Sequence, residues 1–375
     1  MSGSNPTPES EGVRIEEAVE SRLRSLDAGN YRATSRVVLE TFADFLRTRR
    51  CVETLDELSV TDCRRYAQHL RARVRDDEDD LSATSAHAQG PYFTVVRSFL
   101  GWCIDEEWLD RNPARPNRVT DELPEHHGSS DQQFWEQRHR EAILSFVDER
   151  ARHALDGEGD VPLERAYRDR AVVAMLALTG IRGAELFRDP KDEYRNGLRW
   201  RDVDLDAGVA SVLGKVRETE HVALPSTVCS YLDRYRRVQD PPTDDWPVVP
   251  TAHGPTLAAA VRDRLGERGW DETEIADALA EGTQTVISTH EVVPPALTKN
   301  GGRNLMRRLC ASADVDIDGE YLKPHGGRRG LGSQLYERDA ELAQETLRHR
   351  SIETTHDAYR QKQAERRRER LDDIL

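Results

Sequence analysis

The chain has 375 residues and a net charge of −15, from 69 acidic and 54 basic residues. Its length favours two or three domains. No apolar run reaches the 18 or so residues that a membrane span needs, and the N-terminus shows no signal-peptide pattern. The five cysteines form no C-x-x-C pair, which argues against a disulfide framework or a zinc ribbon. We therefore expect a cytoplasmic protein with no membrane partner.

The basic residues are unusual in type. Only five are lysine, and the other 49 are arginine. An acidic surface with few lysines is typical of proteins from salt-loving microbes, where net negative charge maintains solubility. We therefore expect a halophilic protein, and the alternative is a GC-rich codon bias, which also favours arginine over lysine.

The N-terminal part of the chain is predicted to be helical. Residues 1–13 are polar and are expected to form a disordered tail. Further on, Val38, Phe42 and Phe45 recur at helical spacing, which predicts an amphipathic helix. The predicted helices cover residues 31–50, 59–74 and 84–105, and Asn112-Pro113 ends the helical region.

The rest of the chain combines helices with one short stretch of strands. Residues 119–133 are mostly polar and are expected to be a linker. Alternating apolar residues over 202–224 predict a strand–turn–strand. Helices are predicted at 134–154, 164–179, 257–283, 300–313, 326–338, 340–348 and 353–372. The expected fold class is mainly α with a small antiparallel β-sheet (α+β).

One glycine-rich stretch could suggest nucleotide binding. Gly208 to Lys215 reads G-x5-G-K-V. A P-loop has four residues between its glycines and a Ser or Thr after the lysine. The spacing is one residue too long and the hydroxyl that would bind magnesium is missing, so we expect no nucleotide partner.

Five short motifs follow one another along the second half of the chain. Each has an ordinary interpretation by itself, such as a helix N-terminus with a nearby glutamate or a solvated turn lysine. They are Thr179-Gly-Ile-Arg182-Gly-Ala-Glu185-Leu, Gly214-Lys215 in the predicted hairpin, His325-Gly-Gly-Arg328, Leu347-Arg348-His349, and Thr354-Thr355 before Tyr359. Their order and spacing together resemble the tyrosine recombinase family, the phage integrases and Xer-type recombinases, over about residues 15–375.

The resemblance implies an architecture and an activity. Residues 14–118 would form an N-terminal helical core-binding (SAM-like) DNA-binding domain, and 134–375 a tyrosine-recombinase catalytic domain. The enzyme would be a site-specific DNA recombinase (integrase) that cleaves and rejoins strands through a 3′-phosphotyrosine. Its partners would be double-stranded DNA and three further copies of itself, in a homotetramer on paired sites. It would use no cofactor and no metal, and would be associated with the nucleoid.

The motifs contain the groups that a phosphoryl transfer of this kind needs. Arg182 and Arg328 can each present a bidentate fork to phosphate oxygens and stabilise the transition state. Tyr359 would be the nucleophile. Its ordinary pKa is about 10, so attack at neutral pH needs a base or a strong field.

The remaining site residues would handle protons and orientation. His325 would accept the tyrosine proton, and Lys215 would protonate the leaving 5′-hydroxyl. His349 would donate a hydrogen bond to a phosphate oxygen. Glu185 would orient Arg182 or His325.

The sequence departs from the family pattern at three points. His349 and Tyr359 lie ten positions apart, one more than is usual, which predicts either a bulge before the helix that carries Tyr359 or a displaced His349. Arg348 stands where the family usually has glycine. Arg329 follows Arg328 where a histidine is common.

Two other functions fit the same motifs. One is a type IB topoisomerase-like enzyme that relaxes supercoils as a monomer, which the N-terminal helical domain disfavours. The other is a catalytically inactive DNA-binding accessory factor, which Tyr359 and the two arginines disfavour.

Overall fold

The computed structural model describes residues 12–27, 29–76, 86–123, 132–159, 161–214 and 217–372. The chain divides into two compact units, Met1–Ser130 and Asp131–Leu375. Among the described residues, no helix is long and apolar enough to cross a membrane.

The first unit is a group of helices without strands among its described residues. The helices are α1 (Ile15–Ser25), α2 (Asn30–Phe45), a π-helical turn at Leu46–Arg50, α3 (Val60–Asp76), α4 (Ala86–Asp105) and α5 (Asn117–Thr120). The apolar faces of α2, α3 and α4 pack together. Phe42 lies edge-on to Tyr66, with ring centroids 4.8 Å apart, and both rings are buried.

The edges of this unit differ from the sequence-based boundaries. Residues 1–11 of the expected tail lie outside the described residues, whereas Val13 accepts a backbone hydrogen bond from Leu55 at 2.9 Å. Val119 was expected to begin the linker, but it is fully buried in the core of the first unit. Its apolar side chain is covered because α5 packs against α3.

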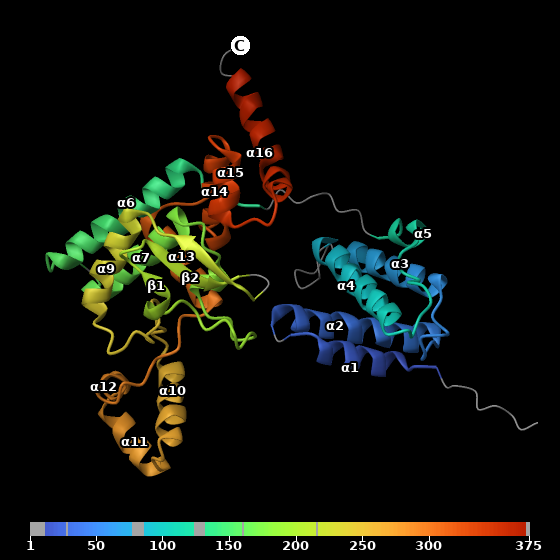
Figure 1. Ribbon diagram of the computed structural model, residues 1–375, viewed down its shortest axis with the longest axis horizontal. Helices are drawn as coiled ribbons and strands as arrows, with labels where there is room; N and C mark the ends of the chain where they lie inside the picture. Colours follow the sequence, from blue (N-terminus) through green and yellow to red (C-terminus); the bar gives the residue numbers. More distant parts are fainter. Residues whose placement is uncertain are drawn as a thin grey trace, which may run out of the picture. The chain divides into compact units, whose positions relative to one another are not determined.

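The second unit holds the remaining helices and the sheet (Figure 1). Its helices are α6 (Gln137–Leu155), α7 (Leu163–Leu178), α8 (Gly183–Leu186), a 3-10 turn at Trp200–Asp202, α9 (Ser226–Gln239), α10 (Gly254–Glu267), α11 (Glu272–Glu281), α12 (Thr283–Thr289), α13 (Lys299–Ala313), α14 (Pro324–Tyr336), α15 (Ala340–Leu347) and α16 (Ile352–Asp372). Its strands are β1 (Val203–Asp204), β2 (Val209–Leu213) and β3 (Thr219–Ala223).

Helix α7 runs through the centre of this unit. From Ala171 to Ala177 every residue is at most 1% exposed. A helix that is apolar on all sides is stable only when it is surrounded by other elements, and α6, α9 and α14 pack against α7. The end of α7 is therefore a fixed platform for the residues that follow it.

The three strands form an antiparallel sheet in the order β1-β2-β3. Ala210 pairs with Val222, and Val212 pairs with Glu220. Paired residues share one face of a sheet, and Ala210, Val212 and Val222 are buried. Glu220 therefore lies on the face of the β2–β3 hairpin that is turned toward the body of the unit.

The single helix predicted over 257–283 is two helices, α10 and α11, and a third helix, α12, begins at Thr283 where the prediction ends. The three helices extend from the rest of the second unit (Figure 1). Gly269 and Gly282 have φ of +87° and +124°, values that end a helix. The Asp271 carboxylate accepts hydrogen bonds from the backbone N–H of Thr273 and Glu274 at 2.8 and 2.9 Å. This cap starts a new helix where the composition predicted a continuous one. The predicted fold class, mainly α with a small antiparallel sheet, is confirmed.

Candidate active site

A tight turn at the end of α7 positions Arg182. Gly180 has φ of +65°, a conformation that favours glycine. A Cβ at Gly180 would lie 3.1 Å from Leu347 Cδ2, so the turn also packs closely against the end of α15. Arg182 then lies immediately before α8.

Glu185 holds Arg182 from within α8. The backbone N–H of Arg182 donates to Glu185 Oε2 at 2.7 Å, and Arg182 Nη1 donates to Oε1 at 2.6 Å. The Glu185 side chain is 0% exposed. Burial alone would lower the pKa of Arg182, but Glu185 and Glu220 outweigh it and raise the pKa. Glu185 thus fixes a fully charged guanidinium.

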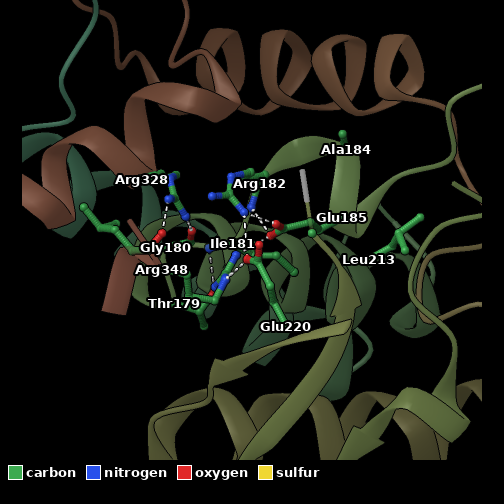
Figure 2. Close-up of polar contacts among 12 residues, drawn as sticks. Thr179, Gly180, Ile181, Arg182, Ala184, Glu185, Leu213, Glu220, Arg328 and Arg348 are labelled. Atoms are coloured by element: carbon green, nitrogen blue, oxygen red, sulfur yellow. Dashed lines mark hydrogen bonds and ion pairs between the residues drawn. The ribbon is translucent and has the colours of Figure 1, made fainter. Parts of the chain in front are cut away.

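The β2–β3 hairpin brings a second carboxylate to Arg182. Glu220 Oε2 accepts from Arg182 Nη1 at 3.0 Å and from Arg348 Nε at 2.8 Å, so this carboxylate links the two arginines (Figure 2). A Cβ on Gly214 would lie 2.2 Å from Glu220 Oε1, so glycine leaves the room that the side chain needs. Arg195 holds the hairpin by donating to the carbonyls of Leu213 and Gly214 at 2.9 and 2.7 Å.

Arg348 ends α15 in a left-handed conformation with φ of 53°. This is the conformation that a C-terminal glycine usually adopts, and it costs a non-glycine residue about 1–2 kcal/mol. The backbone thus has the form expected for the glycine of the family pattern. The side chain is only 10% exposed, and Nη2 donates to Glu185 Oε2 at 2.6 Å. The unusual arginine is therefore part of the site.

Arg328 comes from α14 and is buried beside the other two arginines. Nη1 donates to the Gly180 carbonyl and Nη2 to the Leu347 carbonyl. Burial, with the nearby charges of Arg182 and Arg348, lowers its pKa to about 10. Arg328 is therefore fixed between the end of α7 and the end of α15.

Both candidate histidines are neutral at pH 7. Burial lowers the pKa of His325 to about 4, helped by Arg329 and Arg328. Burial also lowers the pKa of His349 to about 4, helped by Arg328 and Arg182. His349 Nδ1 lies 2.9 Å from Thr355 Oγ1 on α16. A neutral imidazole has a lone pair that can accept a proton.

Tyr359 lies on α16 and packs against α14. It is 3% exposed, and its ring centroid lies 6.3 Å from that of Phe134 and 5.7 Å from that of Tyr336. A Cβ on Gly332 would lie 2.1 Å from the Tyr359 hydroxyl oxygen. Burial raises the pKa of Tyr359 to about 12, and Arg328 and Arg329 oppose the rise. The phenol is therefore protonated at neutral pH.

The structure gathers six of the seven candidate residues. Arg182 and Glu185 are in direct contact, and Arg328 lies close enough to Tyr359 and to His349 to change their pKa values. The sixth residue, His325, lies close enough to Arg182 for the arginine charge to lower its pKa, as that charge also does for His349. Lys215 lies outside the described residues. Between His349 and Tyr359 the chain bends at Arg350 and Ser351 before α16 begins at Ile352.

Glu220 and the closely packed Gly332 were not among the candidates from sequence. A third arginine in the site at position 348 could have signalled a further acid, because buried charges are normally paired. For Gly332, the helical position one turn after Arg328 gave no such signal.

Comparisons with known proteins agree on one family. The family model "Phage integrase family" matches residues 158–366. The tyrosine recombinase XerC of Xanthomonas axonopodis pv. citri (strain 306) is 33% identical over 251 residues, covering 66% of this chain and 70% of the relative. The tyrosine recombinase XerD of Staphylococcus haemolyticus (strain JCSC1435) is 22% identical over 273 residues, covering 72% of this chain and 70% of the relative.

Solved structures show the same fold. A Tn1549 transposon integrase in complex with a circular intermediate DNA has a TM-score of 0.56 at 15% identity, covering 95% of this chain and all of that one. The XerH site-specific recombinase bound to a palindromic difH substrate has a TM-score of 0.53 at 14% identity, covering 88% and 75%. The family match spans more than half of the chain and includes every candidate site residue. The chain belongs to the phage integrase family, the tyrosine recombinases.

Proposed function

We propose that this protein is a site-specific DNA recombinase that cleaves and rejoins strands through Tyr359. The Tyr359 oxygen forms a bond to the scissile phosphorus while the bond from phosphorus to the 5′ oxygen breaks. The product is a 3′-phosphotyrosine and a free 5′-hydroxyl. A 5′-hydroxyl from the partner strand then reverses the step, and the tyrosine recovers its proton.

The observation that carries this proposal is the gathering of Arg182, Arg328, His325, His349 and Tyr359 from four separate parts of the chain. Two fixed guanidiniums can neutralise the non-bridging oxygens of a phosphodiester. The neutral imidazole of His325 accepts the Tyr359 proton, and His349 donates a hydrogen bond to a phosphate oxygen. Glu185 orients Arg182. Lys215, in the Gly214-Lys215 motif, protonates the leaving 5′ oxygen.

The substrate and the assembly follow from the relatives. The Tn1549 integrase and XerH structures contain DNA, and we assign double-stranded DNA as the partner of this chain. The first unit supplies a helical DNA-binding domain. A homotetramer on paired sites would cleave one pair of strands at a time. The C-terminal stretch 363–375, QAERRRERLDDIL, would contact a neighbouring copy.

The competing functions differ in what they require. A type IB topoisomerase-like enzyme would cleave without a specific site, and an inactive accessory factor would form no covalent bond. The XerC and XerD relatives are recombinases by name, which favours the site-specific activity over both.

The test is a covalent trapping assay with nicked suicide duplexes that carry repeats from the DNA beside the gene. The wild-type protein should give a protein–DNA band on a denaturing gel only with the correct site. Tyr359→Phe should bind the same duplex and give no band. Tyr336→Phe is the matched control, since the Tyr336 ring packs on Tyr359, and it should still give the band. An adduct from the Tyr359→Phe protein would refute the nucleophile assignment.

The surface charge suggests where the protein works. We infer a cytoplasmic protein that is adapted to high salt. Its 15 surplus negative charges repel one another near 0.1 M salt, where the Debye length is about 10 Å, and concentrated salt screens this repulsion. Its melting temperature should rise between ~0.1 and ~3 M KCl. A melting temperature that stays flat or falls as salt rises would leave codon bias as the explanation for the small number of lysines.

A further inference from the structure

The two carboxylates of the site are bound in different ways. Glu185 lies within α8, bonds to the backbone N–H of Arg182, and has a side chain that is 0% exposed. Glu220 comes from the separate β2–β3 hairpin, and its side chain is 23% exposed. Glu185 is therefore built into the fold, whereas Glu220 reaches the arginines from the side that solvent can enter.

Glu220 places one anionic oxygen between two guanidiniums. Its Oε2 lies 3.0 Å from Arg182 Nη1 and 2.8 Å from Arg348 Nε. A carboxylate and a phosphodiester each carry one negative charge and two oxygens that accept hydrogen bonds from arginine. The position of this carboxylate is therefore one that a non-bridging phosphate oxygen could take.

The arginines have capacity for a further acceptor. Arg348 Nη1 is buried and has no hydrogen-bond partner within the described residues. The described network also carries three arginines, Arg182, Arg328 and Arg348, against Glu185 and Glu220. A buried donor without an acceptor is costly, and Arg348 could offer this donor to an incoming anion by reorienting its guanidinium.

Glu220 can leave without disturbing the sheet. Its backbone is paired with Val212 in the β2–β3 ladder, and only side-chain torsions need to change for the carboxylate to turn toward solvent. The exchange therefore requires no unfolding of the hairpin.

We propose that Glu220 is an internal anion that occupies the substrate-phosphate position between Arg182 and Arg348, and that Arg348 contacts the phosphate once Glu220 is displaced. This rests on the proposed strand transfer, in which a DNA phosphate enters the site. It adds one arginine to those that bind phosphate and assigns an inhibitory contact to Glu220.

The experiment measures the binding of inorganic phosphate by titration calorimetry at fixed ionic strength, without DNA. Glu220→Gln should bind phosphate about tenfold more tightly than the wild type, the size expected for removing one charge-assisted competitor. Glu218→Gln is the matched control, because it removes the same charge from an exposed position on the same hairpin, and it should leave the affinity unchanged.

A second variant assigns the effect to Arg348. Glu220→Gln combined with Arg348→Gln should lose the gain in affinity, which also separates this site from other arginines on the surface. An unchanged or weaker phosphate affinity in a folded Glu220→Gln protein would overturn the proposal. Glu220 would then serve only to hold Arg182 and Arg348 in place.

The outcome is separable from that of the proposed function. If Glu220→Gln binds phosphate more tightly but the wild-type protein forms no Tyr359 adduct, strand transfer is contradicted and the exchange at Glu220 stands. If the wild-type protein forms the Tyr359 adduct but Glu220→Gln leaves the phosphate affinity unchanged, the exchange is contradicted and strand transfer stands.

Discussion

Two arginine clusters lie along α7, one around Asp169 in its first half and one beyond its end, and they differ in how exposed their acids are. Near the start of the helix, Asp169 is 1% exposed and is contacted by Arg150 at 3.0 Å, Arg168 at 2.8 Å and Arg308 at 3.8 Å. There the acid is buried, and the arginines around it are 13–45% exposed. Beyond the end of the helix, Arg328 is buried and the Arg348 side chain is 10% exposed, while one acid, Glu185, is 0% exposed and the other, Glu220, is 23% exposed.

The difference concerns which charge can be replaced. A buried acid that is surrounded by arginines cannot leave without stranding their charges, so the Asp169 cluster stabilises the fold. An accessible acid in front of buried arginines can be exchanged for another anion. The same residue types therefore hold three helices together around Asp169 and leave a phosphate site beyond the end of α7.

The largest effect should come from Asp169→Asn. Removing one partner from a buried ionic group typically costs 3–5 kcal/mol, and we expect a loss of about that size in the free energy of unfolding by urea. Glu220→Gln should cost about 1 kcal/mol or less, as for partly exposed pairs. Equal losses in the two variants would break the distinction between the clusters.

Gly332→Ala changes the packing around Tyr359 without removing a charge. The new Cβ would lie 2.1 Å from the Tyr359 hydroxyl oxygen and 2.5 Å from Leu347 Cδ1. Overpacking of this kind costs about 1–3 kcal/mol, and Tyr359 should move enough to lower the rate of adduct formation at least about tenfold. Gly266→Ala in α10 is the control, since its Cβ meets nothing within 4 Å, and it should be neutral or stabilising. A Gly332→Ala protein with normal adduct formation would show that Tyr359 has room to shift.

The active-site end should also make stability depend on pH. His325 and His349 have a pKa of about 4 in the folded protein, against about 6.5 in an unfolded chain. Between these values the unfolded state binds more protons, so the free energy of unfolding should fall as pH decreases from 7 toward 4. His325→Gln should make this fall shallower in urea titrations at pH 7.5, 6 and 5. If the wild type and His325→Gln show the same dependence of unfolding free energy on pH, His325 is not buried in solution and its pKa is not lowered.

The smallest effect is expected from Arg348→Gly. Glycine removes a left-handed strain of about 1–2 kcal/mol, while the loss of the pairs with Glu185 and Glu220 acts in the other direction. Because Glu185 and Glu220 both keep Arg182 as a partner, neither acid is left unpaired, and the free energy of unfolding should change by about 1 kcal/mol or less. A loss above about 3 kcal/mol would indicate a cluster that stabilises the fold like the one at Asp169.

Much of this architecture was predictable because the signals are local. The helical spacing of Val38, Phe42 and Phe45 predicts α2, and the alternation around Val212 predicts the hairpin. The breaks between α10, α11 and α12 were not predicted, because a helix cap such as Asp271 is a single residue inside a charged stretch. The first unit extends past the predicted boundary because Val119 is one apolar residue in a polar segment, and only tertiary packing shows that it is buried.

The site was predictable as a set of residues and only partly as a geometry. Motif order placed Arg182, Glu185 and Arg328 together, and the structure adds that Glu185 bonds to Arg182 and Arg348. The contact between Glu220 and Arg348 joins residues 128 positions apart, and no local pattern encodes such a pair. Arg348 departs from the glycine of the family pattern in its side chain only, because its backbone keeps the left-handed conformation that glycine favours.

An acid on the same chain as its arginines also sets which anions can enter. Glu220 is tethered beside Arg182 and Arg348, so its effective concentration there, in the millimolar range or higher, does not depend on the composition of the solution. A free chloride or phosphate brings no other contact and must compete with this tethered group. A phosphate within a bound duplex is itself held in place by the rest of the DNA, and meets Glu220 on equal terms. The site would therefore discriminate by connectivity, disfavouring a dilute free anion and favouring a phosphate that is delivered as part of a polymer.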